Sequence, residues 1–154
     1  MASPAPNQVS PTINIIHNGE VFAMILPGDF RRPGISFFTP PHFSQQLAYI
    51  QHPDGYVIQP HIHQPIDRQV TFTNEVLLLR KGRMRVDFYD EDRNYLISHV
   101  LSAGDVILLV RGGHGFEVLE AAEMIEVKQG PYAAERDKAR FSNQLVTLKY
   151  CQQR

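Results

Sequence analysis

Short β-type runs separated by turn residues are the feature that most limits the folds open to this chain. Residues 12–17 and 20–26 flank Asn18-Gly19, a dipeptide that favours a tight hairpin turn. Further strand-like runs cover residues 46–51, 56–63, 72–80, 83–89, 96–101, 106–110, 116–119 and 124–128. Many short strands at close spacing predict an antiparallel sandwich or barrel.

The rest of the chain is predicted to add little regular structure. Residues 1–11 are rich in proline, serine and alanine and are expected to form a flexible N-terminal arm. Residues 27–41 contain four prolines and are expected to form a loop, whereas residues 132–141, which follow Pro131, have the composition of a short helix. Residues 12–154 are therefore predicted to form a single all-β domain with a short C-terminal helix.

Composition excludes several classes of partner. Fifteen basic and sixteen acidic residues give a formal net charge of −1, and no basic run suggests a nucleic-acid partner. The apolar runs are too short to span a bilayer, so no membrane interaction is expected. No secretory signal is visible, and the single cysteine, Cys151, cannot form an intramolecular disulfide. A cytoplasmic location is expected.

Four residues predict a metal site: His61, His63, Glu75 and His114. In an extended strand alternate side chains share a face, so His61 and His63 point the same way. Glu75 opens an otherwise apolar run, where a carboxylate should be paired or ligated. Imidazole and carboxylate groups suit one divalent transition metal ion, whether Mn, Fe, Co, Ni or Zn.

These residues lie in two segments that resemble the two sequence motifs of the cupin superfamily. The matching residues of the first motif are Gly55, His61, His63, Glu75 and Gly82, and those of the second are Gly104 and His114. The resemblance covers about residues 45–128. It implies a cupin-like jelly-roll β-barrel with one metal in its mouth, held by the three histidines and the glutamate.

The chain departs from the family pattern in the spacer between His63 and Glu75. It has eleven residues, where the family usually has a few, so residues 64–74 are expected to form an extra loop at the rim. Arg68 lies in that loop and could bind a carboxylate or phosphate of a ligand. Gln59 and Arg111 are two further candidate substrate-binding residues, because each lies near a predicted ligand.

The leading hypothesis for function is a metal-binding cupin that acts on a small polar or anionic metabolite, such as a sugar or an organic acid. The resemblance admits isomerase, epimerase, decarboxylase and dioxygenase chemistry, and fold alone does not choose among them. No catalytic residue beyond the ligands is identified. One alternative is a non-catalytic, metal-dependent module that binds a sugar or organic acid. The other is a metal-free isomerase or epimerase in which a histidine acts as the base.

Self-association as a homodimer is also predicted. Residues 12–26 lie outside the motif-bearing part of the chain and have a strand-like apolar pattern. A hairpin of this kind could add to the edge of a neighbour's sheet.

Overall fold

The computed structural model describes residues 11–131, 133 and 136–142. Its strands are β1 (Ile13–His17), β2 (Glu20–Leu26), β3 (Gly34–Phe37), β4 (Ala48–Gln51), β5 (Glu75–Tyr89), β6 (Tyr95–Ser102), β7 (Val106–Leu109) and β8 (Gly113–Lys128). The prediction of an all-β chain is confirmed. Within the described residues, no helix has the length and apolar character needed to cross a membrane.

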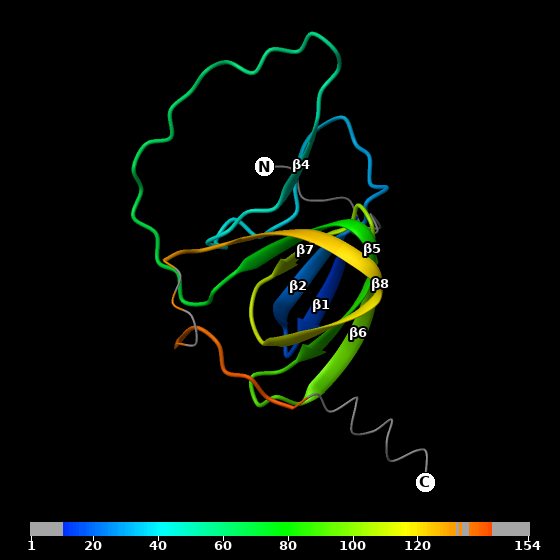
Figure 1. The fold of residues 1–154 in the computed structure, drawn as a ribbon. Helices are drawn as coiled ribbons and strands as arrows, with labels where there is room; N and C mark the ends of the chain where they lie inside the picture. Colours follow the sequence, from blue (N-terminus) through cyan, green and yellow to red (C-terminus); the bar gives the residue numbers. More distant parts are fainter. Residues whose placement is uncertain (1–10, 132, 134–135, 143–154) are drawn as a thin grey trace.

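Six strands form one antiparallel sheet that curls into a half-barrel (Figure 1). Its order is β1-β2-β7-β5-β6, and β8 pairs with β5. The long strand β5 pairs with β7 along its first residues and with β6 along its last, whereas β8 follows it from Glu75 to Tyr89. The hairpin predicted around Asn18-Gly19 is confirmed as the β1–β2 connection.

Alternation along β5 directs the apolar side chains to the concave side of the half-barrel. Met84, Val86 and Phe88 are almost fully buried there. They pack in one cluster with Leu77 and Leu79 from the start of the same strand and with side chains of β1, β2, β6 and β7. The core therefore lies on the inner face of the curled sheet, as period-2 patterning requires.

A bulge at Gly82 lets β5 and β8 stay paired while they bend. The pairing shifts register between Lys81 and Arg83. Gly82 has a φ of +81°, and a Cβ at this position would collide with the carbonyl oxygen of Ala121 on β8. Bulges of this kind bend a strand and increase its local twist.

Replacement of Gly82 by alanine is expected to destabilise the fold by more than about 1 kcal/mol, because the side chain meets backbone and the positive φ disfavours it. Gly130→Ala is the matched control, since a Cβ there has no neighbour within 4 Å. Urea unfolding of both variants measures the difference. Equal midpoints would show that the bulge tolerates a side chain.

The second sheet is small and lies beyond the half-barrel. It consists of β3 and β4, which pair antiparallel from Gly34 to Phe37. Its inner side packs on the half-barrel through a cluster that includes Phe38, Leu47 and Tyr49. The prediction of an entire loop over residues 27–41 was wrong at β3.

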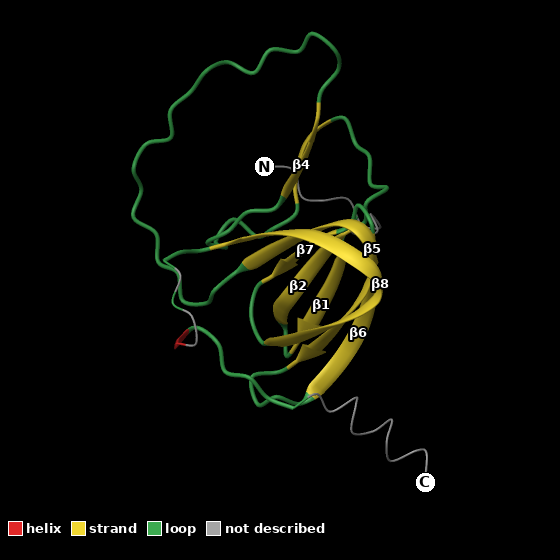
Figure 2. Cartoon of the chain, viewed as in Figure 1, coloured by secondary structure: helices red, strands yellow, loops and turns green. Residues whose placement is uncertain are grey.

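Residues 52–74 connect β4 to β5 as a long exposed loop that arches away from the half-barrel (Figures 1 and 2). We call this segment the arm. The strand predicted at residues 56–63 was wrong, because these residues pair with no strand. The runs predicted at 72–80 and 83–89 form one continuous strand, β5, which begins at Glu75. Those predicted at 116–119 and 124–128 form one continuous strand, β8.

Two predictions fall partly outside the described residues. Of residues 1–11, which were predicted to form a flexible N-terminal segment, the structure describes only residue 11. Of the helix predicted at residues 132–141, residues 133 and 136–141 are described, and they show only an isolated helical turn at Arg136. Asp137 to Phe141 are irregular and lie along the half-barrel, so tertiary contacts have replaced local helix propensity here.

Candidate functional site

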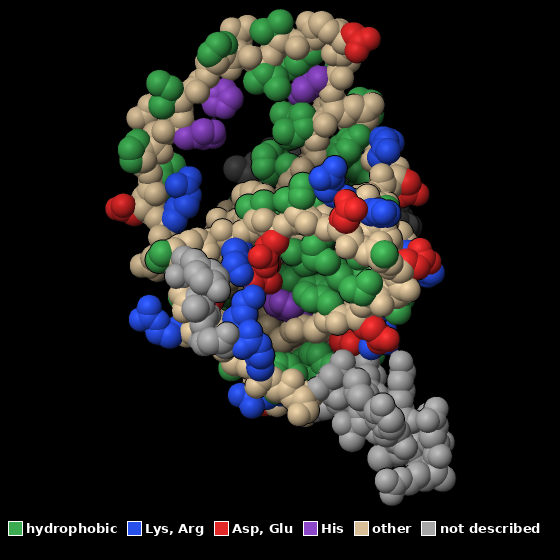
Figure 3. Space-filling model, viewed as in Figure 1, with side chains coloured by type: hydrophobic (Ala, Val, Ile, Leu, Met, Phe, Trp, Pro, Cys, Tyr) green, Lys and Arg blue, Asp and Glu red, His purple; other side chains and the backbone are tan. Residues whose placement is uncertain are grey.

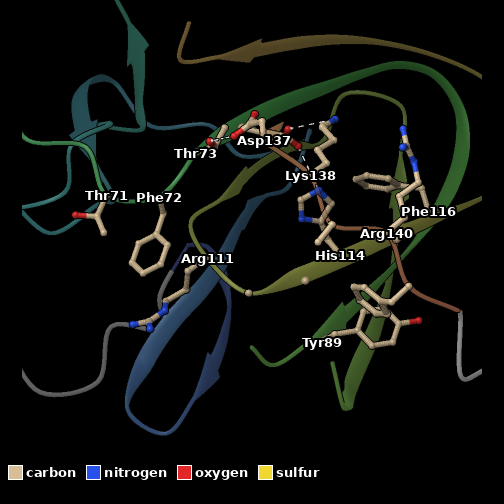
Figure 4. Close-up of a pocket in the computed structure, with 16 residues that line it drawn as sticks. Thr71, Phe72, Thr73, Tyr89, Arg111, His114, Phe116, Asp137, Lys138 and Arg140 are labelled. Atoms are coloured by element: carbon tan, nitrogen blue, oxygen red, sulfur yellow. Dashed lines mark hydrogen bonds and ion pairs between the residues drawn. The ribbon is translucent and has the colours of Figure 1, made fainter. Parts of the chain in front are cut away.

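A pocket of about 680 Å³ lies where the start of β5 meets the start of β8 (Figure 4). Three segments line it: the end of the arm with Glu75, residues 111–116, and residues 137–141. Tyr89, at the end of β5, completes the lining. A volume of this size suits a small-molecule ligand.

The curl of the sheet brings Glu75 and His114 together at this pocket. His114 pairs with Phe88, which is thirteen positions along β5 from Glu75 (88 − 75). A straight strand would separate two such positions by about 43 Å. Instead, His114 Nε2 lies 3.2 Å from Glu75 Oε2, so two of the four predicted ligands are in contact.

Cationic side chains surround the Glu75 carboxylate, which is only 7 % exposed. Lys128 Nζ lies 3.5 Å and Lys138 Nζ 3.9 Å from Oε1, on the oxygen that His114 does not contact. The hydrogen bond from His114 is the main cause that lowers the pKa of Glu75, and it outweighs the opposing effect of burial; the charges of His114, Lys138 and Lys128 lower it further. Glu75 is therefore ionised at neutral pH.

Asn74 fixes the point at which the arm joins β5. Its backbone N–H donates to Gln129 Oε1 at 2.7 Å, and its side-chain Nδ2 donates to the carbonyl of Val110 at 2.8 Å. Ser44 Oγ donates to Asn74 Oδ1 at 3.0 Å. This partly buried polar clasp anchors the chain at the residue immediately before Glu75.

Residues 137–141 form the side of the pocket opposite the arm. Thr73 Oγ1 donates to Asp137 Oδ1 at 2.8 Å, which ties this segment to the end of the arm. The Phe141 ring packs edge-to-face on Tyr89 at a centroid distance of 5.1 Å. Between these two contacts, Lys138 points to Glu75 and His114, and Arg140 lies near Phe116 (Figure 4).

His61 and His63 lie on the arm, away from the pocket. Their ring centroids are 5.2 Å apart, so the two histidines are neighbours as predicted. His61 Nδ1 lies 3.0 Å from the backbone carbonyl of Gln59. Across the described residues, no group of three or more His, Cys, Asp or Glu side chains is placed to hold a metal ion. The four predicted ligands thus form two separate pairs.

The three predicted substrate-binding residues have different positions. Gln59 and Arg68 are exposed on the arm and do not line the pocket, and the Arg68 guanidinium donates to the nearby Ile66 carbonyl at 3.3 Å. Arg111 does line the pocket. Its guanidinium is bound by Glu91 and Glu20 and lies 4.9 Å from the centre of the Phe72 ring, so it is held as part of the wall.

Sequence reasoning missed Lys138 and Arg140 as pocket residues and Lys128 as an ion-pair partner of Glu75. Lys128 ends a strand and could have been recognised from its register, because it pairs with Glu75. Lys138 and Arg140 carried no such signal, because their segment has helical composition and reaches the pocket only through tertiary contacts.

Comparison of the chain with protein families, with curated proteins and with solved structures yields no match.

Proposed function

We propose that this protein is a cupin-like metalloprotein that binds a small anionic metabolite in the pocket at Glu75 and His114. The observation that carries the proposal is the contact between these two side chains, from opposite ends of the β5–β8 ladder, beside Lys128 and Lys138. In the complete site, a divalent transition metal ion is held by Glu75 and His114 together with His61 and His63 from the arm, inside a jelly-roll barrel.

The geometry of the Glu75–His114 pair supports a shared ion. A divalent metal at this site would take His114 Nε2 and Glu75 Oε2 as ligand atoms, because imidazole nitrogen and carboxylate oxygen are donors that such ions bind in proteins. These two atoms lie 3.2 Å apart, and the lysines occupy the other carboxylate oxygen. The Gln59 carbonyl beside His61 Nδ1 leaves Nε2 of that ring as a donor atom, which is the usual way in which a ligand histidine is oriented.

The cations of the pocket support an anionic ligand. Lys128 and Lys138 both contact the single carboxylate of Glu75, and Arg140 also lines the pocket. Among the lining residues, three cations, Arg111, Lys138 and Arg140, stand against two carboxylates, Glu75 and Asp137, which favours a carboxylate or phosphate group on the ligand. Lys138, about half exposed, is the residue best placed to reach from the Glu75 carboxylate to a bound anion.

When bound, a divalent metal would polarise a carbonyl or activate water or dioxygen, as isomerases, epimerases and dioxygenases require. The chain's own residues would orient the ligand: Lys138 by its charge, Phe72 and Phe116 by packing. The same pocket without turnover would serve a binding module for a sugar or organic acid.

Metal analysis tests the proposal directly. We expect purified wild-type protein to contain a divalent transition metal and the His114→Ala variant to have lost it, because a ligand is missing. His42→Ala is the matched control, since His42 is exposed on a loop distant in sequence from every predicted ligand. Elemental analysis of the three proteins gives the result. Wild-type protein that stays metal-free after incubation with Mn²⁺, Fe²⁺, Co²⁺, Ni²⁺ and Zn²⁺ in turn would refute the metal site.

A ligand screen follows on the same samples. We expect organic acids and nucleotide-sugars to raise the melting temperature of metal-loaded protein, because a ligand that binds only the folded state stabilises it. Replacement of Lys138 by methionine should weaken an anionic ligand by about tenfold or more, as loss of a charged hydrogen-bond partner generally does. A neutral sugar that binds both proteins equally would argue against an anionic ligand.

A second candidate is a metal-free isomerase or epimerase. It is favoured by the Glu75–His114 hydrogen bond, which orients the imidazole as a base without any further ligand. Activity that survives chelation by EDTA and is lost in His114→Ala would select it, whereas activity lost on chelation and restored by a divalent metal would exclude it.

A further inference from the structure

Among the described strands, β8 has a partner on one edge only. It pairs with β5 from Gly113 to Lys128, and no described strand pairs with its other edge. Along that edge the backbone N–H and C=O groups of a sixteen-residue strand have no ladder partner in the part of the chain that the structure describes. A long edge of this kind is a template for the addition of another strand.

The side chains of β8 are also uncovered on both faces. Phe116 and Val118 pair with Val86 and Met84, so they face the concave side with the core. Val118 is nevertheless 58 % exposed, whereas Val86 opposite Phe116 is fully buried. On the outer face, Ile125 and Val127 are exposed as well. Apolar residues on both faces indicate that a further strand belongs beside β8.

The arm has the complementary property, a strand-like sequence without a sheet. Four apolar side chains, spaced four residues apart and all at even-numbered positions, are exposed on the arm: Ile58, Ile62, Ile66 and Val70. Ile62 is the extreme case at 86 % exposed. The odd-numbered side carries Val57, His61 and His63. In Figure 3 the arm presents hydrophobic side chains and histidines around an open space.

We propose that the arm of one copy of the chain adds as a strand to the free edge of β8 in a second copy, and that the second copy's arm does the same in return. Within its own chain the arm arches away from β8 (Figure 1), so its side chains are open to a second copy. A reciprocal contact about a two-fold axis satisfies both edges and both arms at once. This assigns the homodimer interface to the arm and β8, in place of the hairpin at residues 12–26.

The exchange also completes the ligand set, a consequence that rests on the proposed function. When the odd-numbered side of the arm faces the concave side of β8, His61 and His63 lie on the same face as His114. The even-numbered residues then lie on the outer face, with Ile125 and Val127. Each metal site is thus built from Glu75 and His114 of one chain and two histidines of the partner.

Mixed dimers test the exchange. One variant carries His61→Ala and His63→Ala, and the other carries Glu75→Gln and His114→Ala; differently tagged chains are co-expressed and heterodimers are isolated by two affinity steps. We expect each variant alone to bind no Zn²⁺ and the heterodimer to recover half of the wild-type Zn²⁺ content, because one of its two sites has all four ligands. A heterodimer without Zn²⁺, while wild-type protein binds it, would show that each arm closes on its own chain and would overturn the proposal.

A second measurement does not depend on metal. Ile62→Cys in a Cys151→Ser background is labelled with a benzophenone maleimide, and ¹⁴N and ¹⁵N chains are mixed, unfolded and refolded together before illumination. We expect mixed-isotope crosslinks to peptides of β8. Crosslinks to β8 within one chain only, or a monomer by sedimentation at high micromolar concentration, would overturn the exchange. If wild-type protein binds no metal but the mixed-isotope crosslinks form, the metal site fails and the exchange stands.

Discussion

Replacement of Asp87 by alanine is expected to destabilise the protein by about 3 kcal/mol, because it removes a buried carboxylate and leaves the largely buried Arg85 paired with the half-exposed Glu117. Asp87 is fully buried on β5. Arg85 donates from Nε to Oδ1 at 2.7 Å and from Nη2 to Oδ2 at 3.0 Å, and Ser98 Oγ donates to Oδ1 at 2.5 Å. Hydrogen bonding to Asp87 is the main cause that raises the pKa of Arg85.

The control for Asp87 is Glu120 on β8, which pairs with Arg83 on β5 with both side chains about half exposed. Surface pairs contribute about 0–1 kcal/mol. Urea unfolding of Asp87→Ala and Glu120→Ala therefore compares a buried carboxylate, which is hydrogen-bonded to an arginine and a serine, with an exposed carboxylate that pairs with an arginine. Similar unfolding midpoints for the two variants would mean that the Asp87 network contributes no more to the free energy of unfolding than an exposed ion pair does.

Replacement of Glu75 by glutamine should give the second large effect. The variant keeps the shape of the side chain but removes the anion that separates Lys128, Lys138 and His114. We expect a loss of about 1–3 kcal/mol at neutral pH, the cost of leaving buried polar groups without their charged partner. Because the pKa of Glu75 is lowered in the folded state, its contribution is present at neutral pH and is lost as the pH falls through that pKa. The stability difference between wild type and variant should shrink in acid.

The same variant separates the two ways in which the pocket could bind an anion. If the ligand binds through a metal held by Glu75, Glu75→Gln should lose the metal and weaken the ligand. If the lysines bind the ligand directly, loss of the neighbouring carboxylate should strengthen it, because the pocket becomes more positive. Calorimetric titration with succinate, with and without Zn²⁺, distinguishes the two by the sign of the change.

Features that depend on the alternation of apolar and polar residues, or on the residues of a turn, were predictable from the sequence. The Asn18-Gly19 hairpin, the strands at β5, β6, β7 and β8, and the all-β class follow from local patterns. Glu75 and His114 were grouped as candidate ligands by residue type and by the cupin resemblance, whereas their contact depends on the curl of the sheet, which local patterns do not give.

What the sequence did not reveal depends on tertiary partners. Residues 56–63 have the pattern of a strand, but a strand exists only when it pairs with another, and within the described residues this one has no partner. Residues 137–141 have the composition of a helix, but contacts of Asp137 and Phe141 hold the segment along the half-barrel instead. For the same reason Lys138 could not be assigned to the pocket.

The hydrogen bonds of Asn74 allow the arm to move while Glu75 and His114 keep their positions in the pocket. They anchor the chain immediately before Glu75, so a swing of the arm pivots ahead of this residue and leaves Glu75 against His114. In the proposed site, Glu75 and His114 would stay fixed, while His61 and His63 would approach and leave the metal ion with the arm. Release of a bound ion would then follow the opening rate of the arm, not the much slower global unfolding of the barrel. A chelator should therefore strip the metal under conditions in which core amide protons remain protected from exchange.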